Sequence, residues 1–335
     1  MQKAAIVILN YNGEKMLRKF LPDVVHHGFY DVIIADNASS DGSLDFLTRD
    51  FPQLETIRLE ANHGFANGYN LALERLRGKY EYYILLNSDI LVTGDWDKKM
   101  IQWLDNNPHI VAAQPKILSY QNRNRFDHAG AGGGYLDQLG YPYCRGRIFN
   151  HTEEDLHQYD DCQEVDWASG ACLFIKANDF HAFGGFDKLF FAHMEEIDLC
   201  WRLRLAGKQI YYNGEVQVYH VNGGTLSRQS PFKTYLNFRN NLLMLYKNLP
   251  WLHFFGVFAL RIGLDFAAML HFWLTEGADH GKAIAKAYFG FFKLRSSVDR
   301  TRPLASKLTK DAKGKKVFSI AFNYYLRGKK TYREL

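Results

Sequence analysis

With 335 residues, 47% of them hydrophobic, the chain can form one large α/β domain with an appendage or two modest domains, and global disorder is excluded. The four cysteines form no C-x-x-C pair and have no histidine cluster around them, which indicates free thiols in a reducing cytoplasm. The formal charge of +5 is uneven: residues 282–335 hold fifteen Lys or Arg and three acids, a net of +12, which leaves −7 for residues 1–281. A basic tail on a mildly acidic body predicts a polyanionic partner surface, either a membrane or a nucleic acid.

Buried strands, polar turns and helices alternate along the first third of the chain, with strands expected at residues 4–9, 32–35, 55–59 and 82–86. The last is an unbroken apolar run (YYILL), which is typical of a strand buried on both faces. The alternation predicts a doubly wound, mostly parallel sheet flanked by helices, with its ligand site at the carboxyl ends of the strands. No G-x-G-x-x-G follows the first strand, which argues against a dinucleotide-binding dehydrogenase, and no secretory signal is expected before it.

The strand at residues 82–86 ends in three small polar residues, Asn87, Ser88 and Asp89. A carboxylate beside an amide oxygen at a strand end suits a hard cation or a sugar hydroxyl. The alternative is that these residues only cap the next helix.

Four polar blocks follow one another along the chain, at residues 7–13 (VILNYNG), 36–42 (DNASSDG), 62–70 (NHGFANGYN) and 86–89 (LNSD). Their order and spacing resemble family 2 glycosyltransferases of the GT-A fold, in particular the rhamnosyltransferase-like branch. The resemblance covers roughly residues 4–245. It implies a Rossmann-like catalytic domain of GT-A type at residues 1–245 and a helical, basic, membrane-associating extension at residues 246–335.

The resemblance assigns the nucleotide to Leu9, Tyr11 and Asp36. The tyrosine ring would stack on the base, and the carboxylate would accept the N–H of a uracil or thymine, so the donor is expected to be a UDP- or dTDP-linked sugar. A turn or cap role is the alternative for Asp36. Asn67 and Asn70 either touch the nucleotide or cap and pack their helix.

The resemblance also assigns Asn87, Ser88, Trp167 and Arg202 to the nucleotide-sugar site. In the family, a segment like residues 167–171 (WASGA) lines the donor sugar. The alternative is that its small residues pack closely against a neighbouring strand.

Arginines outside these positions have two interpretations each. Arg145 and Arg147 lie in the loosely patterned region 115–166 and either meet a phosphate or are solvated. Arg239 either approaches the diphosphate or pairs with an acid.

Three acids, Glu195, Glu196 and Asp198, stand at the start of an apolar-periodic helix, where carboxylates also serve as ordinary capping residues. The family's pattern here is Glu-Asp-x-Asp-Leu-Cys-x-Arg, and its second acid deprotonates the acceptor hydroxyl. That position is Glu196 in this chain, so Glu196 is the expected base, with Glu195 and Asp198 as supporting or rival candidates. Asp198 and Arg202 are at i,i+4, so an ion pair on the helix surface is the alternative for them.

His220 lies at a strand end, ahead of a Gly-Gly-Thr sequence. The resemblance implies that a histidine so placed completes a metal site with Asp89, for Mg²⁺ or Mn²⁺. One carboxylate and one imidazole leave coordination positions for diphosphate oxygens and water. A purely structural histidine is the alternative.

The apolar stretch at residues 249–274 is long enough to cross a bilayer. It contains His253, Arg261, Asp265 and His271, which fall within a third of the helical wheel and leave a wide apolar face. Because Arg and Asp at mid-span would each cost about 2.5–3.5 kcal/mol, an interfacial or core-packed helix is favoured over a span. The basic runs that follow suit anionic lipid headgroups, and nucleic acid is not expected because no binding motif accompanies the charge.

The sequence therefore predicts an inverting, metal-dependent glycosyltransferase that moves a sugar from a nucleotide-diphosphate sugar to a hydroxyl of a glycan or lipid-linked acceptor in cell-surface polysaccharide synthesis. The enzyme is expected in the cytoplasm, peripheral at the inner face of the cell membrane, and it could form a homodimer. The alternative is a catalytically degenerate sugar-nucleotide-binding or scaffold protein, since Asn87 and Glu196 depart from the family's commonest residues. A nucleotidyltransferase would need a Gly-rich phosphate loop after the first strand, which the sequence lacks.

Overall fold

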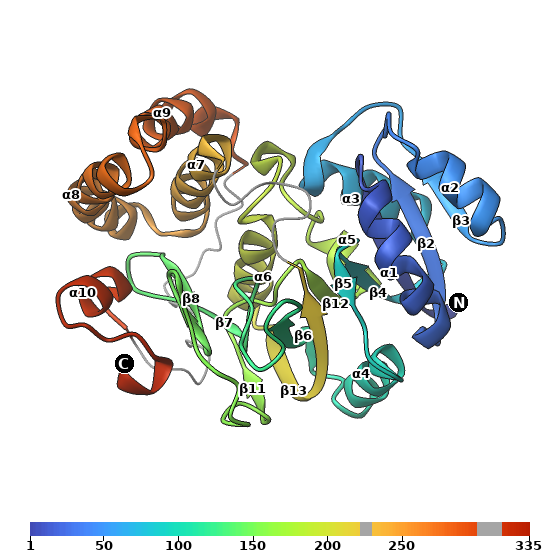
Figure 1. The fold of residues 1–335 in the computed structure, drawn as a ribbon. Coiled ribbons are helices and arrows are strands. Elements are labelled where there is room, and N and C mark those ends of the chain that lie inside the picture. The colour runs from blue at the N-terminus through green and yellow to red at the C-terminus, as the bar shows by residue number, and fades with distance from the viewer. Residues whose placement is uncertain (222–229, 300–316) are drawn as a thin grey trace.

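The computed structural model describes residues 1–221, 230–299 and 317–335 (Figure 1). Within them, the main sheet consists of nine strands: β1 (Gln2–Asn10), β2 (Asp31–Asp36), β3 (Glu55–Arg58), β4 (Tyr80–Leu86), β5 (Ile90–Leu91), β6 (Ile110–Ser119), β11 (Cys162–Glu164), β12 (Cys172–Lys176) and β13 (Gln209–His220). Their order is β11-β13-β6-β12-β4-β1-β2-β3, with β5 paired to β13. The strands expected at 4–9, 32–35, 55–59 and 82–86 are confirmed as β1 to β4.

The sheet is parallel from β3 through β2 and β1 to β4. β12 then runs antiparallel between β4 and β6, while β13 is parallel to β6. The predicted α/β class is thus confirmed. The parallel half brings the carboxyl ends of β1, β2 and β4 to one edge, where Asn10 stands opposite Asp36 in the register.

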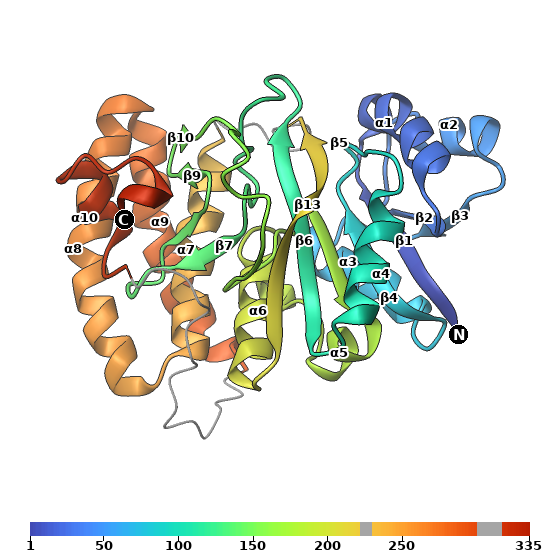
Figure 2. The same ribbon diagram turned by 90° about the horizontal axis from the view of Figure 1, so that it is seen from below.

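Helices cover both faces of the sheet (Figures 1 and 2). They are α1 (Glu14–His27), α2 (Ser43–Asp50), α3 (Gly64–Arg75), α4 (Trp96–Asn106), α5 (Ala177–Ala182) and α6 (Glu195–Leu205). Alternate residues of the central strands feed two separate cores. Leu85 of β4 belongs to the core shared with α3, α5 and α6, whereas Ile84 belongs to the core shared with α1, α2 and α4. Both residues are fully buried, which confirms the prediction of a strand covered on both sides.

A small antiparallel sheet lies in the region where the sequence pattern loosens. It is formed by β7 (Gly134–Leu136), β8 (Pro142–Cys144), β9 (Arg147–Ile148) and β10 (His151–Thr152). The C-terminal segment, with α10 (Ile320–Tyr325), packs on this sheet: the backbone N–H of Ile320 donates to Asp137 at 2.7 Å, and the ring of Tyr332 stacks on Tyr135 with centroids 5.5 Å apart.

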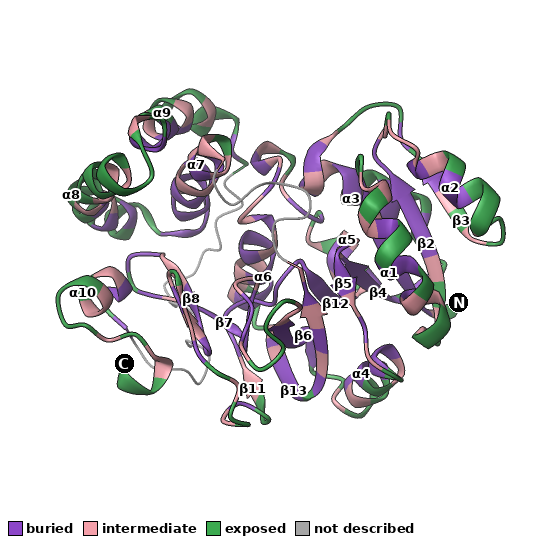
Figure 3. Cartoon of the chain, viewed as in Figure 1, coloured by how far each residue is buried: buried purple, intermediate pink, exposed green. Residues whose placement is uncertain are grey.

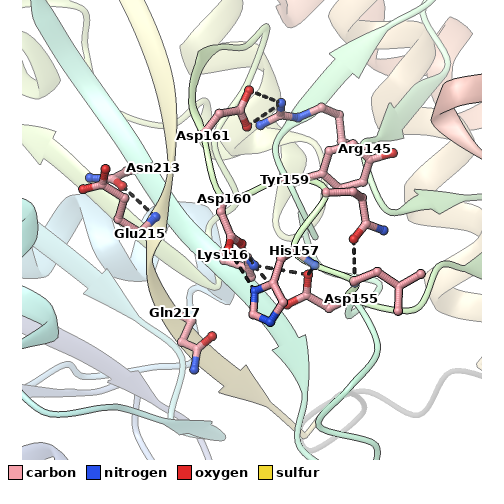
Figure 4. Close-up of polar contacts among 12 residues, drawn as sticks. Lys116, Arg145, Asp155, His157, Tyr159, Asp160, Asp161, Asn213, Glu215 and Gln217 are labelled. Atoms are coloured by element: carbon pink, nitrogen blue, oxygen red, sulfur yellow. Dashed lines mark hydrogen bonds and ion pairs between the residues drawn. The ribbon is translucent and has the colours of Figure 1, made fainter.

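Charged side chains fasten the loop after β10 to the main sheet and to the small sheet (Figure 4). The ammonium of Lys116, on β6, is buried and lies 2.9 Å from Asp155, with Asp160 as its second partner. Arg145 is also buried and lies 2.9 Å from Asp161. The solvated alternative is therefore wrong for Arg145, because its buried guanidinium holds this loop in place, and a contact with phosphate stays a prediction.

Three long helices form a layer on the side of the small sheet: α7 (Pro231–Asn248), α8 (Trp251–Thr275) and α9 (Ala278–Leu294) (Figure 1). The expected division at residue 245 lies inside α7, and it stays a prediction. Helix α8 corresponds to the predicted apolar stretch. Its Arg261 and Asp265 are buried and paired at 3.2 Å, and Asp265 also accepts from Tyr141 (2.5 Å) and Tyr288 (2.8 Å).

This buried ion pair yields a stability prediction. Asp265→Ala leaves the guanidinium of Arg261 buried without its counter-charge, so the free energy of unfolding should fall by about 3–5 kcal/mol. The control is Asp279→Ala on the neighbouring helix, which removes an exposed partner of Lys282 and should change stability by about 1 kcal/mol or less. Urea denaturation followed by circular dichroism measures both, and equal effects would show that the pair contributes nothing beyond a surface contact.

Candidate active site

Polar side chains cluster where β1 and β2 end. Asp36 is 1% exposed; one of its oxygens accepts from the amide of Asn10 (3.0 Å) and the other accepts from the backbone N–H of Ser39 (2.9 Å). The turn role considered for Asp36 is therefore present. Tyr11, which follows Asn10, is 39% exposed at this edge, and Leu9 is half-buried beside it. The nucleotide contacts assigned to Leu9, Tyr11 and Asp36 stay predictions.

Helix α3 starts beside this cluster, and its two asparagines behave differently. The amide of Asn70 donates to the carbonyl of Phe186 (2.7 Å) and accepts from the N–H of the same residue (2.9 Å). Both ends of that amide are used, so the packing alternative is present, and the contact of Asn70 with the nucleotide stays a prediction. Asn67 is partly exposed one turn earlier, and its contact with the nucleotide stays a prediction.

The end of β4 meets the end of β13. Because β5 pairs with β13, Ile90 stands opposite His220, and this places Asp89 against the imidazole: Nε2 lies 3.3 Å from the Asp89 Oδ1. Both side chains are buried. Asn87 and Ser88 are half-exposed just before them. The structure thus brings together the two residues expected to hold a cation.

A third residue, missed by the sequence analysis, completes this arrangement. Asp127 follows β6, is 1% exposed, and its Oδ1 lies 2.8 Å from Nδ1 of His220. A carboxylate on one imidazole nitrogen fixes the ring and its tautomer, so that the other nitrogen faces a metal. The region around Asp127 shows no periodicity, and no signal in the sequence singled it out.

The electrostatics of this site are set by two carboxylates around one imidazole. Burial alone would lower the pKa of His220, but Asp89 and Asp127 raise it to about 10. Burial raises the pKa of Asp127, and the contact with His220 outweighs this and lowers it. The two carboxylates therefore favour the protonated imidazolium over the neutral ring.

Asp89 and His220 fit as ligands of a divalent cation, provided that the nucleotide sugar supplies further ligands. In residues 1–221, 230–299 and 317–335, no group of three or more His, Cys, Asp or Glu is arranged to bind a metal. Asp89 and His220 offer one hard oxygen and one nitrogen, and diphosphate oxygens and water would complete the coordination.

The start of α6 carries the candidate base on an unusual backbone. Phe191, His193 and Met194 all have positive φ, at 64°, 70° and 73°. Asn240 of α7 holds this segment, with its Nδ2 at 2.8 Å from three successive acceptors, the carbonyls of Phe190, Ala192 and His193. Residues in the left-handed region persist only where surrounding contacts fix them, and such residues concentrate at active sites.

Glu195 and Glu196 follow directly. One oxygen of each carboxylate is buried with no hydrogen-bond partner in the described part of the chain. Burial raises the pKa of Glu195 far above its usual range, and the neighbouring Glu196 raises it further. Burial also raises the pKa of Glu196, while backbone N–H groups, including that of Gly170, oppose the shift. A buried, unsatisfied carboxylate with a raised pKa is a strong candidate for proton transfer.

Asp198 differs from these two acids. It is fully buried and accepts from Arg202 Nε (2.8 Å), Lys247 Nζ (2.9 Å) and Asn248 Nδ2 (2.8 Å). Burial raises its pKa, but Arg202 and Lys247 outweigh this and lower it. Every polar atom of the carboxylate already has a protein partner, which favours a structural role, and its role as a rival base stays a prediction. The ion pair with Arg202 is present, but in the interior and not on the surface.

Three other side chains also have partners within the protein. Besides Asp198, Arg202 donates to the carbonyls of Gly185 (2.7 Å) and Phe183, and its assignment to the donor site stays a prediction. The indole N–H of Trp167 donates to the carbonyl of Tyr135 (3.1 Å), and the ring lies buried against Gly134. Arg239 donates to the carbonyl of Phe190 (3.0 Å) and pairs with no acid in the described part of the chain, and its approach to the diphosphate stays a prediction.

Comparison with known proteins fits this arrangement. Residues 5–163 match the family model "Glycosyl transferase family 2", a match that ends before α6. Rhamnosyltransferase WbbL of Escherichia coli (strain K12) is 24% identical over 222 residues, which cover 64% of this chain and 81% of that protein. The N-acetylglucosaminyl-diphospho-decaprenol L-rhamnosyltransferase of Mycobacterium tuberculosis (strain ATCC 25618 / H37Rv) is 23% identical over 239 residues, covering 67% of this chain and 77% of that one.

Solved structures share the fold at low identity. GalNAc-T7 with UDP, GalNAc and Mn²⁺ has a TM-score of 0.55 at 13% identity, covering 74% of this chain and 48% of that chain. S. aureus TarS 1–349 in complex with UDP-GlcNAc has a TM-score of 0.53 at 16% identity, covering 87% and 81%. The fold is thus that of GT-A glycosyltransferases. The chain is a glycosyltransferase whose residues 5–163 match family 2, and it is similar to the rhamnosyltransferases of that family.

Asp127 provides a test of the metal site that does not require turnover. Asp127→Asn removes the charge that orients His220, so the affinity for Mn²⁺ in the presence of UDP should fall about 10–100-fold. Isothermal titration calorimetry measures this, with Asp89→Ala as the variant expected to abolish metal binding and the exposed Asp279→Asn as the control. An unchanged affinity in Asp127→Asn would show that Asp127 does not act on the metal site.

Proposed function

We propose that the protein transfers a sugar from a UDP- or dTDP-linked donor to a hydroxyl of a glycan or lipid-linked acceptor, with inversion at the anomeric carbon and with a divalent cation, Mg²⁺ or Mn²⁺. Its place would be cell-surface polysaccharide synthesis, as a peripheral protein at the inner, cytoplasmic face of the membrane. The observation that carries the proposal is the unsatisfied carboxylate oxygen of Glu196 at the start of α6, in the same fold that joins Asp89 to His220 at the strand ends.

Glu196 is the proposed base because of its contrast with Glu195. Glu195 is 3% exposed, and burial together with the charge of Glu196 raises its pKa well above the ordinary glutamate value, which favours its protonated form. Glu196 is partly exposed, and backbone N–H groups oppose the rise of its pKa, so it is the member of the pair that ionises more readily. Only the ionised member can accept a proton.

The proposed reaction is a single displacement. Glu196 takes the proton from the acceptor hydroxyl as that oxygen forms a bond to the anomeric carbon, and the bond from that carbon to the diphosphate breaks. Attack from the side opposite the leaving group inverts the configuration. A cation held by Asp89 and His220 would supply positive charge against the diphosphate. The remaining donor contacts are proposed for Leu9, Tyr11, Asp36, Asn67, Asn87 and Ser88.

Relatives and neighbours support the donor and acceptor classes. The named mycobacterial relative is a rhamnosyltransferase for a diphospho-decaprenol-linked N-acetylglucosamine. Structural neighbours were solved with UDP-GlcNAc and with GDP-Man and Mn²⁺. In the proposed division of the chain, residues 1–245 perform the transfer and residues 246–335 form the membrane-associating extension.

The base assignment predicts an ordered series of variants. Glu196→Gln should keep donor affinity and lose about 10²–10⁴-fold in kcat, the worth of a positioned general base. Glu196→Asp should retain more activity, since it keeps the carboxylate, and the exposed Glu215→Gln serves as the control. Transfer from radiolabelled UDP- and dTDP-sugars measures the rates. If Glu195→Gln proved the more damaging change, the base would lie one residue earlier. If the wild type binds donors but transfers sugar from none of them, the alternative of a catalytically degenerate sugar-nucleotide-binding protein would be favoured.

The raised pKa of Glu196 predicts the acidic limb of the pH–rate profile. The base acts only when deprotonated, so kcat/KM should fall as the pH is lowered through a pKa above the ordinary glutamate value. In Glu196→Gln this limb should disappear along with most of the rate. A wild-type limb at the ordinary glutamate position would mean that the donor or acceptor, and not the buried Glu196, sets the profile.

A further inference from the structure

Helix α8 turns its apolar side outward. The helix is long and apolar enough to cross a bilayer, yet only 17% of its most apolar 18-residue stretch is buried against the described part of the chain. Large exposed side chains run along its length, at Leu252, Phe255, Ile262, Phe266, Trp273 and Leu274. At 100° per residue, these six fall within about a third of the circumference. Figure 3 shows this exposed surface along α8.

The opposite side of α8 holds the charges and binds the body of the protein. Phe254, Val257, Arg261 and Asp265 are buried, and they lie across the helix from the exposed stripe. Arg261 also donates to the carbonyl of Leu139 at 3.2 Å, beside the small sheet. The sequence analysis counted these charges against membrane insertion of the whole helix. In the structure they point away from the exposed stripe, and they fix the helix along the protein surface.

Helix α10 extends the same surface. The ring of Tyr325 lies 5.5 Å from His271 of α8, and Phe318, Phe322 and Leu326 are exposed beside it. The two helices lie side by side in both views (Figures 1 and 2). The contacts of Ile320 and Tyr332 with the small sheet hold α10 in this position.

Basic residues border this apolar surface. Arg327 and Lys330 follow α10 directly, and α9 presents Lys282, Lys286 and Lys293 to solvent. All of them belong to residues 282–335, with a net charge of +12. An apolar surface with a basic border matches an anionic bilayer, which offers hydrocarbon and negative headgroups together.

We propose that α8 and α10 form one lipid-binding face, the α8–α10 face, which lies in a single leaflet of an anionic membrane with α8 parallel to the bilayer plane. The proposal rests on the membrane location in the proposed function and specifies the surface and its orientation. The Arg261–Asp265 pair keeps α8 on the protein, so the helix binds the membrane from one side and does not cross it.

Vesicle binding tests the face. The full chain should sediment with vesicles of phosphatidylcholine and phosphatidylglycerol, bind pure phosphatidylcholine poorly, and be released by high salt or alkaline carbonate. Phe266→Glu and Phe322→Glu should each lower the partition coefficient about tenfold or more, the worth of burying one large apolar side chain. The matched control is Phe29→Glu, an exposed phenylalanine (62%, against 57% for Phe266 and 44% for Phe322) between α1 and β2, which lie at the opposite end of the molecule from α8 (Figures 1 and 2).

Donor binding and melting temperature, measured on the same variants without vesicles, should match the wild type. A variant that loses vesicle binding while its donor binding and melting temperature stay unchanged supports the α8–α10 face. Failure of the wild type to bind any nucleotide-sugar donor would count against the proposed function alone. Equal vesicle binding by Phe266→Glu, Phe322→Glu and Phe29→Glu would overturn the face. A second result would also overturn the face. If the wild type does not bind vesicles, light scattering shows a dimer, and Phe266→Glu dissociates that dimer, the face joins two copies of the chain.

Orientation has its own measurement. Trp251 and Trp273 are both exposed and stand at the two ends of α8, about 33 Å apart along the axis. If α8 lies in the membrane plane, an impermeant quencher outside the vesicles should quench the fluorescence of Trp251 and Trp273 to a similar extent. The contribution of each tryptophan is obtained by comparing the wild type with Trp251→Phe and Trp273→Phe. A spanning helix would protect one of them and would need detergent for release, and that result would overturn the in-plane orientation.

Discussion

The carboxylate of Asp198 is the interaction on which the geometry of the active site depends. It is fully buried and binds Arg202 of its own helix together with Lys247 and Asn248 of α7. A buried charge of this kind is stable only with all its partners in place. Because α6 also carries Glu196 at its first turn, the same contacts that join α6 to α7 determine where the proposed base stands. Asn240 of α7 fixes the backbone immediately before it.

Neighbouring acids on one helix thus have opposite roles, and hydrogen bonding distinguishes them. Asp198 has a protein donor for each oxygen, whereas Glu195 and Glu196 each leave one oxygen unsatisfied within the described chain. Leaving a buried polar atom unpaired costs about 1–3 kcal/mol, so such atoms are retained where a ligand completes them. Glu196 has this unfinished character, whereas Asp89 and His220 are paired with each other, and both places lie at ends of regular elements.

The sequence was sufficient to predict the four parallel strands, because each is a continuous apolar run that ends in small polar residues. It also predicted that Asp89 and His220 would come together, since both positions carry the family's pattern. It failed for Asp127, which reaches His220 across 93 residues from a region without periodicity. It offered the Asp198–Arg202 ion pair as an alternative, but it could not show that Lys247, 49 residues away, binds the same carboxylate. For α8, the helical wheel gave the charged side, but only the tertiary structure shows which side meets the protein.

The left-handed backbone at His193 and Met194 has a consequence for how this enzyme can change. Each non-glycine residue in that conformation costs roughly 1–2 kcal/mol, and the contacts from α7 offset it. Glycine at either position would relieve the strain and also free the first turn of α6 to move. Selection for heat resistance alone would favour that exchange, while selection for turnover would oppose it. The segment before the proposed base is therefore a place where stability and activity compete directly, and where thermotolerant relatives should show which of the two prevailed.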